Sequence, residues 1–201
     1  MATGAPSEMA QTQAHADSSG PSFESHDIRT TRINEGPGVT LSQQQKVLVG
    51  SVLDLFEGNP TLKHLGFWSR NALFTDPLTV AQGYDKYAAQ WYGLPAVFSP
   101  IKIQNHTVTS AGNPIEMNLS NKYVVKGIKK EQVIDSVVRI HVGNDGKIDK
   151  VEDRWNNKLP EGSISEAFRK LNAVTVPTIV KVPKNDEEDM KMKAVRDAKS
   201  S

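Results

Sequence analysis

The sequence predicts an α+β fold in which helices close the concave face of a cone-shaped, curved antiparallel sheet. Three observations carry this prediction. Apolar residues recur with helical spacing between residues 40 and 95, and they alternate with polar residues between 100 and 155. A short amphipathic stretch then follows at residues 163–171. Because helices that cover a curved sheet enclose a hollow, this order also predicts a pocket.

Two helices open the predicted domain. Residues 40–43 (Thr-Leu-Ser-Gln) form a capping box, whose hydroxyl and amide side chains satisfy free backbone N–H groups. Asn59 and Pro60 begin a second, short helix, with Asn as the cap and Pro at the first helical position. Gly58 is a typical stop for the first helix, which presents one apolar face made of Leu48, Val52, Leu55 and Phe56.

The chain then alternates between strand and helix. A short strand is expected at residues 72–75, and a second capping box at 79–82 predicts a helix that ends at Gly93 and Pro95. A third capping box at 163–166 predicts the last helix.

Between these helices, a period of two over residues 100–155 predicts an antiparallel meander. One of its turns contains the Asp-Gly hairpin signal at 145–146. Ile148 and Val151 fall on opposite parities, so a bulge is expected in the last strand.

Composition divides the chain into one domain and two tails. Residues 1–39 are rich in Ser, Gly, Thr, Pro and Gln, and residues 184–201 carry five acidic and five basic side chains. Neither stretch has enough apolar surface to offset the entropy of ordering it. We therefore expect a disordered tail over 1–39, a charged disordered tail over 184–201, and one domain over 40–183. That domain ends in a helix and an extended segment.

Charge and cysteine content exclude several functions. The 201 residues carry a formal net charge of +1 and no cysteine. The charge argues against a nucleic-acid binder, and the missing cysteines exclude disulfides, thiolate metal sites and a Cys nucleophile. The five histidines lack metal-ligand spacing, so neither a metal nor a cofactor is expected. Apolar runs fall short of the ~20 residues of a membrane helix. We expect no membrane partner and a cytoplasmic location, with a nuclear one also open.

Three segments within residues 40–156 resemble the nuclear-transport-factor-2-like superfamily, also called SnoaL-like. Residues 74–77 (Phe-Thr-Asp-Pro) are similar to the family's F-x-D-P segment, and Gly83 matches a small residue early in the next helix. Residues 145–155 resemble the closing hairpin. The fungal SigF-like branch is one branch to which the sequence could belong. The superfamily contains isomerases, dehydratases, cyclases, epoxide hydrolases and binding modules, so the resemblance does not select a reaction.

The resemblance implies a general base at Asp76, where the steroid isomerases keep theirs. The alternative is that Asp76 only caps the turn before Pro77. The isomerases also need a Tyr on the first helix and a protonated Asp on the penultimate strand. These positions fall on Ser51 and Val138, so a steroid-type mechanism is in doubt.

Other residues could serve a catalytic or binding role. Asp153 shares the parity of Trp155 on the last strand, and His106 is a second ionisable candidate. A structural or surface role is the alternative for each. The aromatic stripe can equally be core. The residues expected to contact a substrate are Trp68, Phe74, Tyr84, Tyr87, Trp91, Met117 and Trp155.

Two functions from different classes follow. The first is binding of a small apolar molecule in the cone, with cofactor-free acid/base chemistry of the cyclase, dehydratase or isomerase type. The second is a non-catalytic dimerisation or interaction module, which would use the outward sheet face around Asp135, Val137, Arg139 and His141 and could form a homodimer. An open cavity of at least ~300 Å³ with an Asp at its wall favours the first, and a filled cone favours the second.

Overall fold

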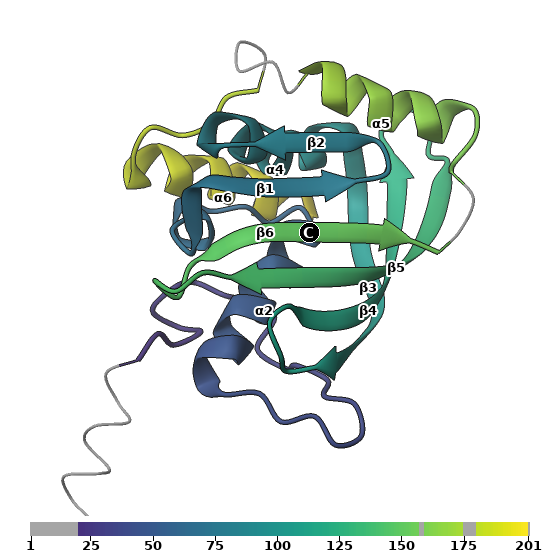
Figure 1. The fold of residues 1–201 in the computed structure, drawn as a ribbon. Coiled ribbons are helices and arrows are strands. Elements are labelled where there is room, and N and C mark those ends of the chain that lie inside the picture. Colours follow the sequence, from purple (N-terminus) through teal and green to yellow (C-terminus); the bar gives the residue numbers. More distant parts are fainter. Residues whose placement is uncertain (1–19, 157–158, 175–179, 201) are drawn as a thin grey trace, which may run out of the picture.

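The computed structural model describes residues 20–156, 159–174 and 180–200. They form one six-stranded sheet with helices gathered on one side (Figure 1). The predicted α+β class is confirmed. The elements in chain order are α2 (Gln43–Phe56), α3 (Leu62–Leu65), β1 (Trp68–Asp76), β2 (Thr79–Gln82), α4 (Tyr84–Val97), β3 (Phe98–Ser110), β4 (Ile115–Val125), β5 (Glu131–Val142), β6 (Ile148–Trp155), α5 (Ser163–Val174) and α6 (Asp186–Ser200).

The sheet has the strand order β2-β1-β6-β5-β4-β3 and is not closed into a barrel. Strands β3 to β6 form the predicted antiparallel meander, and the predicted bulge in β6 is present as a register shift opposite His141 and Val142. The sheet is mixed, because β1 pairs parallel to β6. The all-antiparallel expectation was wrong here, since alternating polarity identifies a strand but says nothing about its neighbour or direction.

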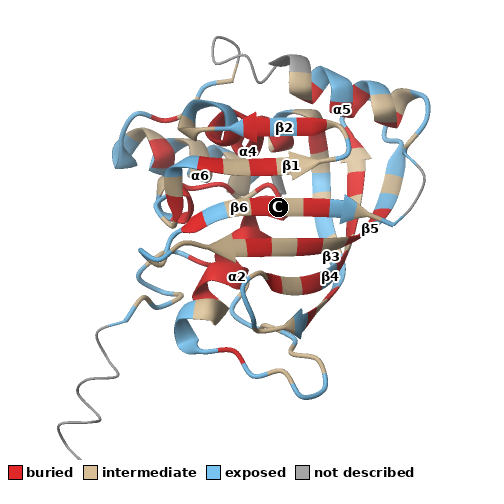
Figure 2. Cartoon of the chain, in the orientation of Figure 1, coloured by how far each residue is buried: buried red, intermediate tan, exposed pale blue. Residues whose placement is uncertain are grey.

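The core lies between the concave face of the sheet and helices α2 and α4. Buried residues alternate with less buried ones along the strands (Figure 2). Inward residues of β4 and β5, such as Met117 and Val138, are fully buried, as are Val52 and Leu55 of α2. The predicted helix face of α2 therefore packs against the predicted strand faces, which fixes which side of each strand looks into the cone.

Helix α2 begins two residues later than expected. Ser42 is the cap: its hydroxyl accepts the N–H of Gln45, and the Gln45 side chain accepts the N–H of Ser42. The helix ends at the expected Gly58, whose φ of +73° favours glycine. A side chain at Gly58 would also collide with Ile101 of β3, so the chain turns close to the sheet edge there.

The helix expected after residues 79–82 begins and ends at other residues than predicted. Residues 79–82 form strand β2, and α4 starts at Tyr84 and continues through Gly93 and Pro95 to Val97. A β-hairpin with β1 satisfies the backbone of 79–82, so its capping side chains are not needed. Gly93 lies within the helix, and Leu171 of α5 packs where a side chain at this position would lie.

Both predicted disordered tails are partly ordered. Residues 29 and 30 donate backbone N–H groups to the buried carboxylate of Asp54, and residues 34–36 bond to β3. Residues 186–200 form α6, where the buried Asp189 accepts the N–H of Leu62 and the hydroxyl of Tyr92. Composition alone does not predict such single polar contacts, so it does not predict the order that they produce. The remainder of the predicted disorder and of the extended segment, residues 1–19, 175–179 and 201, lies outside the described residues.

Candidate active site in the cone

A small cavity of about 20 Å³ lies inside the cone. Ten side chains from the sheet, from α2 and α4 and from α5 surround it: Phe56, Phe74, Asp76, Gln90, Trp91, Leu94, Tyr123, Asp153, Trp155 and Phe168. Five of these were predicted as site residues, namely Asp76, Asp153, Phe74, Trp91 and Trp155. The cavity is far smaller than the ~300 Å³ that would favour small-molecule binding over an interaction module, because Phe168 and its aromatic neighbours fill the cone.

Asp153 is buried on β6, directly opposite Val138 of β5. Its Oδ2 accepts the indole N–H of Trp155 at 2.7 Å. Burial raises the pKa of the Asp153 carboxyl to about 7, against which its hydrogen bonds with Ser136 and Trp155 act, while the negative charge of Asp76 adds to the rise. The carboxyl group is therefore poised between its two protonation states near neutral pH.

Asp76 has the capping role that was the alternative to catalysis. Its Oδ1 accepts the N–H of Leu78 at 2.7 Å, at the tight turn between β1 and β2. Burial raises the pKa of Asp76, although hydrogen bonds from Leu78 and Thr79 oppose this rise. The same side chain lines the cavity with Asp153, so the turn holds a second carboxyl group at the site.

Three polar atoms at this cavity have no hydrogen-bond partner among the described residues. They are Asp153 Oδ1, Gln90 Oε1 and Trp91 Nε1. An unpaired buried polar atom costs about 1–3 kcal/mol, so natural interiors hold few of them. Two acceptors and one donor around one hollow form a set that a single polar group could complete.

Aromatic rings close the cavity on the side of α5. Phe168 of α5 lies 5.3 Å from Trp155, 5.5 Å from Tyr123 and 4.7 Å from Phe98, measured between ring centroids. Tyr123 is fully enclosed, and burial together with the charge of Asp153 raises the pKa of its hydroxyl well above the usual value. Tyr123 therefore stays a neutral hydrogen-bond donor.

The other predicted site residues lie elsewhere. His106 is buried on β3, where its Nε2 accepts the N–H of Asn34, and it does not line the cavity. Tyr87 stacks on Trp68, with 5.1 Å between ring centroids, and Tyr84 packs edge-on against Tyr87. Met117 is fully buried in the sheet face. These side chains belong to the core around the site and not to its wall.

Gln90, Tyr123 and Phe168 were not predicted as site residues. Gln90 follows Tyr87 and Ala88 on the buried side of α4, and a polar residue on an apolar helix stripe was the signal that could have identified it. Tyr123 carried only the signal of a strand core residue. Phe168 lies on α5, and nothing local in the sequence says that α5 crosses the mouth of the cone.

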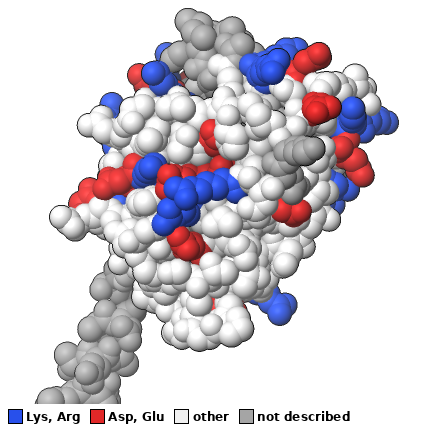
Figure 3. Space-filling view, turned by 45° about the vertical axis from the view of Figure 1, so that its right-hand side comes forward, with Lys and Arg blue, Asp and Glu red and all other residues white. Residues whose placement is uncertain are grey.

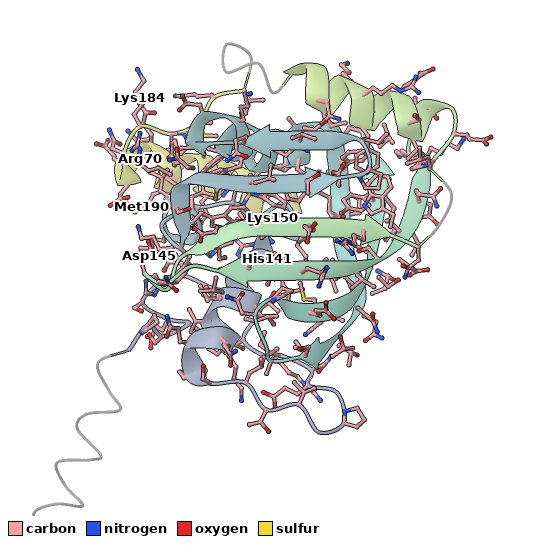
Figure 4. All side chains as sticks on the ribbon, in the orientation of Figure 1. Arg70, His141, Asp145, Lys150, Lys184 and Met190 are labelled. Carbon is pink, nitrogen blue, oxygen red and sulfur yellow. The ribbon has the colours of Figure 1, made fainter. Side chains whose placement is uncertain are left out.

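The opposite, outer face of the sheet carries charges of both signs (Figure 3). Glu152 lies within 4.0 Å of four basic groups, namely Arg139, His141, Lys150 and Arg154. The bond from Lys150 is the main reason that the pKa of Glu152 falls to about 2. His141 and Lys150 project from neighbouring strands on this face (Figure 4). The predicted outward direction of Arg139 and His141 is confirmed.

Among the described residues, no group of three or more His, Asp or Glu side chains could hold a metal ion. None of the described helices is both long enough and apolar enough to span a bilayer.

Solved structures of three bacterial proteins are similar to this chain. An NTF2-like protein of unknown function from Exiguobacterium sp. aligns with a TM-score of 0.46 and 14% identity, over 55% of this chain and 99% of its own. A protein with a ketosteroid isomerase-like fold from Catenulispora acidiphila gives 0.45 and 11%, over 53% and 82%. An NTF2-like protein of unknown function from Burkholderia pseudomallei gives 0.46 and 13%, over 62% and 96%.

No family model matches the sequence, and no curated protein matches it either. Membership of the fungal SigF-like branch stays a prediction.

Proposed function

We propose that the cone binds a small apolar molecule with one oxygen function, and that Asp153 moves a proton to or from it without a cofactor. This is chemistry of the cyclase, dehydratase or isomerase type. The observation that carries the proposal is that three residues lining one cavity, Asp153, Gln90 and Trp91, each have a buried polar atom without a hydrogen-bond partner among the described residues. A ligand oxygen or hydroxyl could pair with them, while aromatic rings contact the apolar remainder.

The protonation state of Asp153 suits proton transfer. A pKa of about 7 leaves both the acid and the carboxylate populated at neutral pH, which is the condition under which general acid/base catalysis is most effective. As carboxylate, Asp153 takes a proton from a carbon next to a ligand carbonyl and leaves an enolate. As acid, it returns that proton. The neutral hydroxyl of Tyr123, on the same cavity, is a candidate donor to the enolate oxygen.

The resemblance to steroid isomerases gains a physical basis from the sheet register. Their strand acid corresponds to Val138, which is apolar here, but Val138 pairs directly with Asp153 on the next strand. Paired residues on neighbouring strands lie about 5 Å apart, so a carboxyl group reaches nearly the same space from the adjacent strand. In this proposal Asp153 is the catalytic residue and takes up the proton itself, whereas the strand acid of the isomerases is protonated. The charge of Asp76 raises the pKa of Asp153.

Ligand entry requires a displacement of Phe168, because 20 Å³ holds only about one water molecule. Phe168 is contributed by α5, which packs on α4 and on the rings at the mouth of the cone. A ligand ring that replaces the Phe168 ring would keep the aromatic contacts to Trp155 and Tyr123.

Exchange of 2-tetralone α-protons in deuterium oxide, followed by NMR, tests the proposal. The wild-type protein should accelerate exchange, and Asp153→Asn should lower the protein-catalysed rate by at least about a hundredfold. Phe168→Leu, which opens the cone without removing its apolar character, should exchange at least as fast as wild type. Asp145→Asn, an exposed turn residue, is the matched control. Equal rates for wild type and Asp153→Asn would refute the catalytic role.

A non-catalytic interaction module is the second candidate, and the filled cone is the observation that favours it. The outer sheet face, with Arg139 and Glu152 at its centre, would then contact a second copy of the chain. Sedimentation velocity on wild type and Arg139→Glu separates the two candidates. A dimer that Arg139→Glu dissociates, together with no exchange of 2-tetralone, would favour the module.

A further inference from the structure

A second and larger hollow lies outside the cone. It is an open groove of about 1030 Å³ between α6, the last turn of α4, and the first half of β3. We call it the α6 groove. It shares no lining residue with the Asp153 cavity, so it contains neither Asp76 nor Asp153. It is therefore a separate candidate site.

The floor of the α6 groove is apolar. Pro95 of α4, Ile101 and Ile103 of β3, and Met192 and Val195 of α6 contribute to it. Val195 is 54% exposed, although it belongs to a helix that docks on the core through other residues. Exposed apolar side chains that line one hollow mark a surface that binds an apolar group.

The rim of the α6 groove is basic. Six Lys and Arg residues line the groove against two acidic residues, Glu57 and Glu188. Lys102 is exposed and forms no ion pair within the described part of the chain, whereas Lys191 extends from α6 into solvent and forms an ion pair with Glu187 at 2.6 Å. The groove thus combines an apolar floor with an excess of positive charge.

The edge of β3 is poorly suited to a peptide that would add as another strand. Glu57 already accepts the N–H of Ile103 at 3.1 Å, and further along the strand Val108 exchanges hydrogen bonds with residues 34 and 36. Pairing of a new strand needs a row of free backbone groups. Side chains, and not backbone, are what this groove offers to a ligand.

We propose that the α6 groove binds a long-chain fatty acid. The acyl chain lies on the floor formed by Ile101, Met192 and Val195, and a rim lysine such as Lys102 or Lys191 meets the carboxylate. Charge complementarity and the apolar floor argue for this occupant over a neutral or cationic one. The volume is at the upper end of the range of small-molecule sites, so one extended chain fits.

Displacement of dansyl-undecanoic acid fluorescence by palmitate tests this inference on the full chain. Wild type should bind the probe saturably, and palmitate should displace it. Val195→Glu should weaken probe binding at least tenfold, because it places a negative charge on the floor. Val80→Glu is the matched control, since Val80 is a 74% exposed valine on β2, outside the groove.

The charge of the rim is tested separately. The double variant Lys102→Glu, Lys191→Glu should weaken palmitate at least tenfold and hexadecanol by less, with Lys86→Glu as control. Circular dichroism verifies that each variant is folded. Wild type that shows no saturable binding, binding that Val195→Glu leaves unchanged, or equal affinity for palmitate, hexadecanol and dodecyltrimethylammonium would each overturn the proposal. Asp153→Asn should leave palmitate affinity unchanged, which separates this site from the cone.

Discussion

The side chain of Asp153 links the stability of the protein to pH. Its pKa is about 7 in the folded chain because it is buried, against an ordinary value of 3.8. Between these two values the folded state holds a proton that the unfolded state has released. The free energy of unfolding therefore falls as the pH rises through this window, and the full loss is present above the folded pKa.

Asp153→Asn should remove this dependence. The unfolding free energy of wild type minus that of the variant is expected to fall by up to about 4 kcal/mol between pH 4 and pH 8, at 1.36 kcal/mol for each pKa unit. Urea unfolding at steps of pH measures it. Asp145→Asn should leave the wild-type profile unchanged. A constant difference between wild type and Asp153→Asn would show that the carboxyl of Asp153 is ionised in the folded protein at all these pH values.

The sequence predicted which carboxyl groups reach the site but not what completes it. The F-x-D-P segment identified Asp76, and strand parity identified Asp153 together with Trp155. Parity failed for His106, because a register shift between Ile103 and Asn105 interrupts the alternation along β3. Contacts such as that of Phe168 depend on how α5 is placed, and periodicity within a helix does not contain that information.

Helix α6 shows how a charged segment can be held to the domain by few contacts. Asp189 is the buried anchor, bonded to Leu62 and Tyr92, and Arg196 donates to the carbonyl of Pro60. The sequence predicted a tail because α6 is mostly polar. The residues that hold this helix to the domain, Asp189 and Arg196, are themselves charged. A pattern of apolar residues cannot report an interface made of buried hydrogen bonds.

Asp189→Ala should detach α6. It leaves the buried donors of Leu62 and Tyr92 without their acceptor, so a loss of about 1–3 kcal/mol in unfolding free energy is expected. Amide hydrogen exchange should show faster exchange across α6 while the strands β4 and β5 keep their protection. Asp186→Ala, at an exposed position on the same helix, provides the comparison. Unchanged protection of α6 in Asp189→Ala would mean that other contacts hold it.

Phe168 is one of the buried residues through which helix α5 packs at the mouth of the cone. Phe168→Ala should cost about 3–5 kcal/mol of unfolding free energy, because it removes a buried ring from contact with Trp155, Tyr123 and Phe98. The space that remains is lined by aromatic rings, so benzene should bind to the variant and raise its melting temperature. Benzene should not do so for wild type. A small loss of stability and no response to benzene would contradict the burial of Phe168.

At the scale of the whole molecule, the sequence predicted the order of the elements along the chain more securely than which elements lie next to each other in space. The meander β3 to β6 was predictable because consecutive strands with short turns pair with each other. The parallel contact of β1 with β6 joins segments about 75 residues apart in sequence, and only packing in three dimensions selects it. That contact places Asp76 of β1 and Asp153 of β6 at the same cavity.

The pH profile of the wild-type chain reflects buried groups with opposite effects. Burial lowers the pKa of His64 and of His106. Near pH 6.5 the unfolded chain therefore binds protons that the folded chain does not bind. These two groups reduce stability as the pH falls, whereas Asp153 reduces it as the pH rises. Between pH 4 and 6.5 the contributions oppose each other, so the unfolding free energy of wild type should fall less on acidification than that of Asp153→Asn.

Below pH 4, Glu152 adds to the loss of unfolding free energy. Glu152, with a pKa of about 2 in the folded chain and 4.5 as its ordinary value, loses its stabilising ion pairs as the pH falls toward 2. We therefore expect urea midpoints of wild type that fall less from pH 6.5 to 4 than those of Asp153→Asn, and that drop further below pH 4. A wild-type midpoint that falls as steeply as that of Asp153→Asn would mean that no buried carboxyl offsets the histidines.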